Sequence, residues 1–450
     1  MTGERNIRRL AGMMRGVELR TEPHVRVVYG FDATGRSMVP AAVAFPRSIE
    51  ETSRLMRAAH MTGVPVVMRG AGTGFSGGSV PEPGGLVVST ERLDRIGRLD
   101  TGAGTVEVGA GVVNARLQEF LERRGWFYPP DPASFRVSTI GGNIAENAGG
   151  PRAFKYGVTR RWVRSIVWVD AAGGVHDTAM QGLSALLCGA EGTLGAVCSA
   201  RLGVLPLPEA RRVSIVAAGQ DAEAMRSAGE LLAAGLTPGV LEFIDEGTMR
   251  CVGEYMRVDP FGGGTACLFL EIDGCAEDVE MQQDLLERFC RARSLRRITA
   301  RGAQERDRLW EMRRAISPSL ARRGVTKINE DVSLPLGRLA EAVEWMHSAA
   351  GELGLDCYLF GHCGDGNIHV NIMTDRRRAD EMRRAEEFVD RLFRWTAAAG
   401  GTLSGEHGIG TTKRGWLGVI FSPAEISLQR AIQRAMDPAG LLNPGSYFAG

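Results

Sequence analysis

Short apolar runs alternate with amphipathic stretches along most of the chain. Between residues 37 and 90 the order is strand, helix, strand, glycine-rich loop, strand. The helix is predicted from apolar residues at helical spacing in IEETSRLMRAAHMTG, residues 49–63. TVEVGAG, from residue 105, predicts a further strand, and VVNARLQEFLERRG predicts a helix that Gly125 closes. LPLPEA, near residue 205, has two prolines and marks a domain boundary.

Beyond this boundary the alternation becomes regular. Four strands (RRVSIVAAG, GVLEFID, TACLFLEID and SLRRITA) alternate with two long helical stretches. This order predicts one antiparallel sheet covered by helices. We therefore expect an α+β protein with a first domain at 1–205, an α+β second domain at 206–420, and a C-terminal segment at 421–450 that returns to the first domain.

Charge and hydropathy exclude several classes of function. The 54 basic and 53 acidic residues give a net charge of +1, and no basic block is interleaved with aromatic residues, so we expect no nucleic-acid partner. No apolar stretch is long enough to cross a bilayer, and arginines interrupt the N-terminal region, so we expect no signal peptide and a cytoplasmic protein. The eight cysteines form no CxxC pair, which excludes a zinc ribbon and a cysteine-ligated iron–sulfur cluster, and most are expected to be buried.

Glycine is abundant, with 59 residues, and gathers in short windows. The first window contains Gly72-x-Gly74-x-x-Gly77, the spacing of a dinucleotide-binding Rossmann loop. Pro81 and Pro83 follow, however, and the chain enters a strand where a Rossmann loop opens a helix. No lysine follows as in a P-loop, so the prediction is a loop whose backbone N–H groups surround a diphosphate; a tight surface turn is the alternative.

Two more windows favour the ligand-binding interpretation. STIGGNIAENAGGPRAFKYG at 138–157 follows PPDPAS, and CGAEGTLG lies at 188–195. Small residues and side-chain amides such as Asn143 and Asn147 suit a long polar ligand. Three such loops in the first domain indicate a large dinucleotide.

A second group of chemically active residues lies in CYLFGHCGDGNIHVNIM, which predicts a hairpin. His362 and His369 would face each other across its two strands, with Asn371 on the same face as His369. Glu406 and His407 are adjacent in GTLSGEHGIG. Two histidines and one carboxylate form a known triad for divalent metals, and zinc, iron and manganese all accept it; structural histidines are the alternative.

RGAGTGFSGG, DPAS, STIGGNIAENAGG, KYG and EGTLG, in this order, resemble the FAD-binding domain of the vanillyl-alcohol oxidase/p-cresol methylhydroxylase (PCMH-type) superfamily. Within it, the chain resembles the D-2-hydroxyacid dehydrogenase branch, which includes glycolate oxidase subunit GlcD and FAD-linked D-lactate dehydrogenase. The resemblance implies a two-subdomain FAD-binding domain, a cap domain, and non-covalent FAD, since the first loop has no histidine. The FAD contacts that it implies are Arg69, Gly70, Ala71, Gly72, Thr73, Gly74, Gly77, Gly78, Pro132, Ser138, Thr139, Gly141, Gly142, Asn147, Gly149, Tyr156, Gly157, Glu191, Gly195 and Asn443.

The resemblance also implies roles for the later residues. His362, His369 and Glu406 match metal ligands, and His407 matches the general base. Substrate binding is assigned to Arg313, Ser317, Lys327 and Asn371. A solvated helix arginine is the alternative for Arg313, and Ser317 is expected four residues later on the same helical face.

The expected reaction is oxidation of a small D-2-hydroxy acid (lactate, glycolate or 2-hydroxyglutarate) to the 2-keto acid, with hydride transfer to the flavin. Electrons would leave to an iron–sulfur subunit, an electron-transfer flavoprotein or a quinone, and any membrane association would come through such a partner. Two alternatives remain: a flavin enzyme acting on a sugar lactone or alcohol, and a flavin-bearing electron-transfer subunit without its own catalysis.

Overall fold

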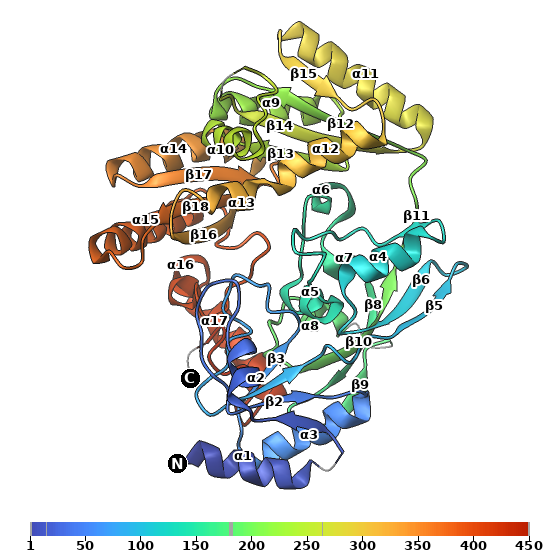
Figure 1. Ribbon diagram of the computed structural model, residues 1–450, viewed down its shortest axis with the longest axis vertical. Coiled ribbons are helices and arrows are strands. Elements are labelled where there is room, and N and C mark those ends of the chain that lie inside the picture. Colours follow the sequence, from blue (N-terminus) through green and yellow to red (C-terminus); the bar gives the residue numbers. More distant parts are fainter. Residues whose placement is uncertain (1, 15, 180–182, 263, 449–450) are drawn as a thin grey trace. The chain divides into compact units, whose positions relative to one another are not determined.

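The computed structural model describes residues 2–14, 16–179, 183–262 and 264–448 (Figure 1). The chain forms two compact units. The first unit comprises 1–149, 157–207 and 406–450, and the second comprises 150–156 and 208–405. The chain therefore leaves the first unit briefly at 150–156, which we name the crossing segment, and returns to it at Glu406. The main change from the first unit to the second lies at 207/208, and the return lies at 405/406. The sequence alone predicted these changes at 205/206 and 420/421.

The first unit begins with a four-stranded sheet in the order β1-β2-β4-β3. Its strands are β1 (Glu18–Arg20), β2 (Ala42–Phe45), β3 (Val66–Arg69) and β4 (Leu86–Ser89). β4 pairs in parallel with both β2 and β3, and α3 (Ile49–Thr62) connects β2 to β3. Ser48 caps the start of α3 and Gly63, in the left-handed region, ends it. The glycine-rich loop after β3 leads into β4 without a helix, as the sequence predicts.

The second sheet of this unit has five antiparallel strands in the order β5-β6-β10-β8-β9. They are β5 (Ile96–Asp100), β6 (Thr105–Gly109), β8 (Val163–Val169), β9 (Val175–Asp177) and β10 (Ala196–Gly203). A two-stranded ladder joins β7 (Trp126–Phe127) to β11 (Leu205–Pro206). The other helices of the unit are α1 (Thr2–Met13), α2 (Pro23–Val28), α4 (Asn114–Glu122), α5 (Ile140–Glu146), α7 (Thr159–Trp162), α8 (Ser184–Leu187), the 3-10 turn η2 (Arg414–Trp416), α16 (Leu417–Ile420) and α17 (Pro423–Met436).

The C-terminal segment is held in the first unit by backbone pairing. Val66 donates its N–H to the Leu441 carbonyl at 2.7 Å, and Asn443 donates its N–H to the Val66 carbonyl at 2.8 Å. Leu442, in the parallel bridge to Val66, is buried in the core that α1 and α3 share with the four-stranded sheet. This confirms that the chain returns to the first unit after the second.

The second unit is built on one seven-stranded sheet in the order β15-β12-β14-β13-β17-β18-β16. Every pair of neighbouring strands in it is antiparallel, as predicted. The strands are β12 (Ala210–Ala217), β13 (Val240–Ile244), β14 (Cys267–Gly274), β15 (Arg296–Thr299), β16 (Thr326–Ser333), β17 (Asp356–Gly361) and β18 (Asn367–Thr374). The helices are α6 (Ala153–Tyr156), α9 (Asp221–Ala233), α10 (Glu246–Met256), α11 (Ala276–Ala292), α12 (Ala303–Arg314), α13 (Ile316–Leu320), the 3-10 turn η1 (Leu336–Arg338), α14 (Leu339–Glu352) and α15 (Ala379–Ala398).

The two faces of this sheet differ in character because side chains alternate along each strand. One face carries apolar residues such as Leu268, Leu270, Val370 and Ile372, all buried. The other face packs its apolar residues against α10, α12 and α13 but also carries buried glutamates, histidines and asparagines. A buried polar row on a sheet face is costly unless its members satisfy one another, so this face is where chemistry is expected.

The crossing segment is attached to this second unit by ionic contacts. Lys155 Nζ donates to Asp273 Oδ1 at 2.6 Å, and the Tyr156 hydroxyl donates to Asp273 Oδ2 at 2.7 Å. Arg152 Nη2 lies 3.4 Å from Glu271 Oε1. Both acceptors are buried on β14, so the segment's basic side chains compensate the charge of two buried carboxylates.

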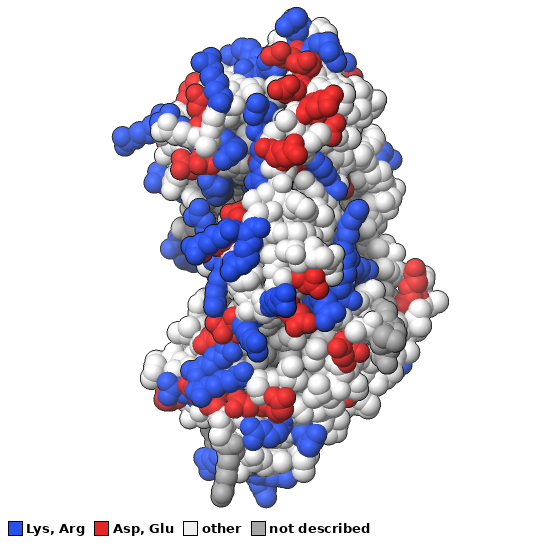
Figure 2. Space-filling model, turned by 90° about the vertical axis from the view of Figure 1, so that its right-hand side faces the viewer, with Lys and Arg blue, Asp and Glu red and all other residues white. Residues whose placement is uncertain are grey.

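Surface charges are mixed. Figure 2 shows basic and acidic side chains interspersed over the visible face, and exposed pairs such as Arg116 with Asp94, at 2.7 Å, contribute little to stability. No helix in the described residues is both long and apolar enough to span a bilayer. Of the eight cysteines six are buried, as expected, and Cys275 is exposed.

Candidate functional site

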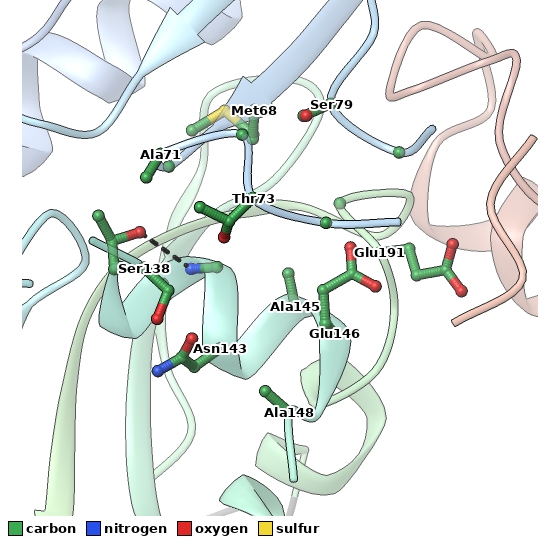
Figure 3. A pocket seen from close by; sticks show the side chains of 18 of the residues that line it. Met68, Ala71, Thr73, Ser79, Ser138, Asn143, Ala145, Glu146, Ala148 and Glu191 are labelled. Carbon is green, nitrogen blue, oxygen red and sulfur yellow. Dashed lines mark hydrogen bonds between the residues drawn. The ribbon is translucent and has the colours of Figure 1, made fainter. Parts of the chain in front are cut away.

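The first unit contains a cavity lined by the three glycine-rich windows (Figure 3). Its walls come from the loop after β3, from the start of α5 and the loop before it, and from the loop before β10. In Figure 3, Thr73 points from the first loop toward α5, while Glu146 and Glu191 lie together at one end. The sequence windows therefore converge in space, although more than 100 residues of chain separate Arg69 from Glu191.

Most of the residues to which the sequence assigned FAD contacts line this cavity: Arg69, Gly70, Ala71, Gly72, Thr73, Gly74, Gly78, Pro132, Ser138, Thr139, Gly141, Gly142, Glu191 and Gly195. Six others are not among the lining residues that the structure describes: Gly77, Asn147, Gly149, Tyr156, Gly157 and Asn443. Asn147 ends α5 with φ 50° and accepts the Arg160 N–H, and Asn443 donates to the carbonyls of Gly78 and Glu191. Asn443 is thus hydrogen bonded to two residues of the cavity wall, and Asn147 ends a helix that forms part of it. Tyr156 lies in the second unit.

The sequence reasoning missed part of the lining. Met68, Phe75, Thr90, Leu187 and Val197 all contribute. Phe75 lies within the first glycine loop, Leu187 ends α8, and the other three lie at or next to strand ends. As ordinary apolar or small polar residues they carry no local signal of a ligand.

The walls of the cavity are shaped by backbone. Gly72 has φ +67°, a conformation that favours glycine, and a Cβ on Gly70 would lie 2.2 Å from Thr139 Oγ1. The first loop can therefore approach the start of α5 only without a side chain at Gly70. A wall of small residues and backbone N–H groups fits a long ligand with a diphosphate in its middle, such as FAD.

Glu406 and His407 line the same cavity, although they follow the second unit in sequence. Their loop is held by Glu191, which is 5% exposed: Oε1 accepts the Ile409 N–H at 2.7 Å, and Oε2 accepts the Gly410 N–H at 2.6 Å. A Cβ on Gly408 would lie 2.7 Å from carboxylate oxygens of both Glu146 and Glu191.

Electrostatics add to this attachment. Burial raises the pKa of Glu191, while the two amide N–H groups, the Ser446 hydroxyl and the nearby Lys413 ammonium act to lower it. The ring of His407 lies 5.0 Å from that of Phe75, centroid to centroid. His407 thus lines the cavity from a loop whose next residues, Ile409 and Gly410, are hydrogen bonded to Glu191.

The predicted hairpin is confirmed as β17 and β18, which lie between β13 and β16 in the second unit's sheet. His369 lies opposite Phe360 on one side and opposite Asp331 on the other. His362 follows two residues after Phe360, and its ring centroid lies 5.2 Å from that of His369 with the planes at 88°. Both histidines are buried on the polar face of the sheet.

Glu242, on β13, was not identified from the sequence. Its Oε1 is hydrogen bonded to His362 Nδ1, and its Oε2 accepts from Arg313 Nε at 2.6 Å and lies 2.5 Å from Nη2. Burial alone would raise the pKa of Glu242, but Arg313 and His362 outweigh it and lower that pKa to about 2. Its only sequence signal is an acidic residue within the apolar run VLEFI.

The other residues assigned to substrate binding lie on α13, β16 and β18 of the same unit. The expected continuous helix through Arg313 and Ser317 is interrupted: α12 ends at Arg314, and α13 begins at Ile316. Lys327 Nζ nevertheless donates to Ser317 Oγ at 3.1 Å, and burial lowers the pKa of Lys327. Asn371 is fully buried, and its Nδ2 donates to the carbonyls of Tyr358 and His369, both at 3.3 Å.

A second polar cluster in this unit consists of His347, Asp221 and Asp245. His347 Nε2, on α14, is 3.1 Å from Asp221 Oδ2 and 3.4 Å from Asp245 Oδ2. Burial acts to lower the pKa of His347, but the two carboxylates raise it to about 9. Asp245 also caps α10 and accepts the Leu359 N–H, so a charged His347 ties α14 to the starts of α9 and α10.

Comparison with known proteins adds to this geometry. Residues 40–179 match the family described as FAD binding domain, and residues 207–447 match FAD linked oxidases, C-terminal domain. Glycolate oxidase subunit GlcD of Bacillus subtilis is 36% identical over 434 residues, which cover 94% of this chain and 92% of that protein. D-2-hydroxyglutarate dehydrogenase of Stutzerimonas stutzeri is 32% identical over 440 residues, which cover 94% of each. The solved structure of p-cresol methylhydroxylase with substrate bound has a TM-score of 0.81, covers 99% of this chain and 97% of its own, and at 15% identity shows the shared fold.

Proposed function

Since the chain belongs to the family of FAD-linked oxidases, we propose that it oxidises a D-2-hydroxy acid to the corresponding 2-keto acid with FAD as the hydride acceptor. Relatives named glycolate oxidase subunit GlcD, D-2-hydroxyglutarate dehydrogenase and D-lactate dehydrogenase support this substrate class. They disfavour a sugar lactone or a simple alcohol, because each named substrate carries a hydroxyl next to a carboxylate.

The observation that carries the proposal is that His407 lines the same cavity as the glycine-rich loops. FAD bound there would accept the substrate's α-hydrogen as a hydride at the flavin N5 atom. His407 would take the hydroxyl proton as general base, the role that histidine fills most often in enzymes. The loop contacts to Glu191 hold His407 in place for this proton transfer.

His362, His369 and Glu406 are proposed to hold a divalent metal. The two imidazole rings lie 5.2 Å apart, centroid to centroid, and Nδ1 of His362 is hydrogen bonded to Glu242, so Nε2 would be its ligand atom. Glu406 follows Gly405, whose N–H donates to Asp331 Oδ2 at 2.7 Å, and Asp331 is the cross-strand neighbour of His369. Glu406 is therefore joined by one peptide bond to a residue that is hydrogen bonded to the ladder of His369. A metal bound there would act as a Lewis acid that lowers the pKa of the substrate hydroxyl.

Arg313 is proposed to bind the substrate carboxylate, since a guanidinium matches a carboxylate in shape and charge. Lys327, Ser317 and Asn371 would complete the substrate pocket from β16, α13 and β18. Electrons would pass to an iron–sulfur or electron-transfer flavoprotein partner, or to a quinone. Any membrane association would follow from that partner.

The test is anaerobic bleaching of the flavin's visible absorption band in purified protein, with D- and L-lactate, glycolate and both enantiomers of 2-hydroxyglutarate. We expect rapid bleaching with at least one D-acid or with glycolate, and none with the matched L-acids. His407→Gln should retain yellow cofactor but lose bleaching. Protein that cannot be reconstituted with FAD, or whose flavin none of these acids reduces, would refute the proposal.

A further inference from the structure

We propose that Glu242 is a positioning residue that sets both the metal ligand His362 and the substrate-binding Arg313 with one carboxylate. The inference rests on the proposed function, since it takes the roles of these two partners from there. It assigns a role to a residue on β13 that lies 71 positions before Arg313 and 120 before His362.

The geometry divides the two oxygens of Glu242 between the two partners. Oε1 faces His362 Nδ1, while Oε2 receives Nε of Arg313 and lies 2.5 Å from Nη2. Glu242 is 0% exposed, so bulk solvent does not reach these contacts. Arg313 is also held over the Phe360 ring, with Cζ 5.1 Å from its centroid.

Each contact has a consequence for binding. Engagement of Nδ1 fixes the ring orientation and tautomer of His362, and carboxylates that do this to metal-bound histidines strengthen metal binding. On the other side, contacts through Nε and Nη2 fix the plane of the Arg313 guanidinium and leave Nη1 for a substrate carboxylate. Because one rigid group serves both, loss of its charge or reach should weaken the metal and the substrate together.

Glutamine cannot replace Glu242 in both roles. Its amide has one acceptor oxygen and one donor NH₂ group, so whichever partner meets the NH₂ faces donor against donor. Aspartate is one methylene shorter and can reach only one partner. Both variants should therefore separate the two contacts that glutamate makes together.

The alternative is that Glu242 is only a buried counter-ion for Arg313. Glu271 offers a matched control: it is 1% exposed, lies on the neighbouring strand β14, and accepts from Trp310 Nε1 at 2.8 Å and from Arg152 Nη2 at 3.4 Å. Glu271→Gln removes a buried, paired charge from the same sheet without touching His362. Stability effects common to both variants are thereby separated from effects on the metal.

The experiment measures Zn²⁺ affinity of the FAD-loaded protein by competition with a chromogenic chelator, together with kcat and KM for the hydroxy acid. We expect Glu242→Gln to weaken Zn²⁺ binding by about 10- to 100-fold and to raise KM, while Glu271→Gln leaves Zn²⁺ affinity unchanged. Where Glu242→Gln does not fold, Glu242→Asp carries the same expectation.

Wild-type Zn²⁺ affinity in the Glu242 variant, or equal weakening in the Glu271 variant, would overturn the inference. Wild-type protein that binds no divalent metal would instead refute the metal centre proposed above, so the two failures are distinguishable.

Discussion

The contact between Glu191 and the loop that carries His407 gives a quantitative prediction. In Glu191→Gln, one amide oxygen can accept either the Ile409 or the Gly410 N–H, and the NH₂ group meets the other N–H as a second donor. A hydrogen bond to a charged group contributes about 1.5–3 kcal/mol, and one of the two is lost. Lys413, 2% exposed, also loses the charge of a nearby carboxylate.

The loss should act first on this loop, because both contacts of Glu191 are to the loop's own backbone. The Thr411 N–H keeps its bond to the Ser76 carbonyl at 2.8 Å, so opening is expected to be centred on Ile409 and Gly410. We therefore expect the free energy of opening residues 406–411 to fall by about 1.5–3 kcal/mol, which corresponds to about 10- to 150-fold faster amide exchange. Hydrogen–deuterium exchange with peptide-level mass spectrometry measures this directly. It does not require two-state unfolding, which a chain with two units need not show.

Glu91→Gln is the matched control in the same unit, since Glu91 accepts from the Tyr29 hydroxyl at 2.6 Å and does not contact the loop. In the control, exchange of the His407 loop should equal that of the wild type. Unchanged exchange of the loop in Glu191→Gln, or a loss of protection spread equally over the first unit, would refute the reasoning.

Three further substitutions test other parts of the molecule. Gly141→Ala places a Cβ 2.7 Å from Ala110 Cβ and should lower the free energy of unfolding by about 1–3 kcal/mol and weaken FAD retention. In the control Gly12→Ala, the new Cβ meets no atom within 4 Å and neither effect is expected. Equal melting temperatures of the two variants would contradict this. His347 has a folded pKa of about 9 against an ordinary value of 6.5, so its stabilisation is complete below about pH 6.5 and disappears as pH rises through about 9. The side chain is 33% exposed, so solvent screens part of this interaction. We expect His347→Gln to lower the free energy of unfolding by about 1–2 kcal/mol near pH 6 and by little near pH 10. Parallel pH profiles of thermal melting in variant and wild type would disprove the link. Asp273→Asn should release the crossing segment, seen as faster proteolysis within 150–156, and unchanged cleavage there would show that the ion pairs do not hold it.

Local sequence determined the features that depend on neighbouring residues. The prolines after the first glycine loop excluded a helix there, and the loop does lead directly into a strand. The two apolar runs and the glycine turn between them predicted the hairpin of β17 and β18. They also predicted that His362 and His369 face each other, and the two ring centroids lie 5.2 Å apart. Clusters of glycine identified the cavity wall for a similar reason, since a backbone that must approach a ligand closely excludes side chains wherever it lies in the fold.

Tertiary structure decided which distant segments meet. Glu242 is an acidic residue in an apolar strand, and only the pairing of β13 with β17 brings it to His362. Likewise, nothing near Glu191 in the sequence indicates that it holds a loop that follows 218 positions later. The register of a long-range ladder depends on packing over the whole sheet, and no short window of residues contains that information.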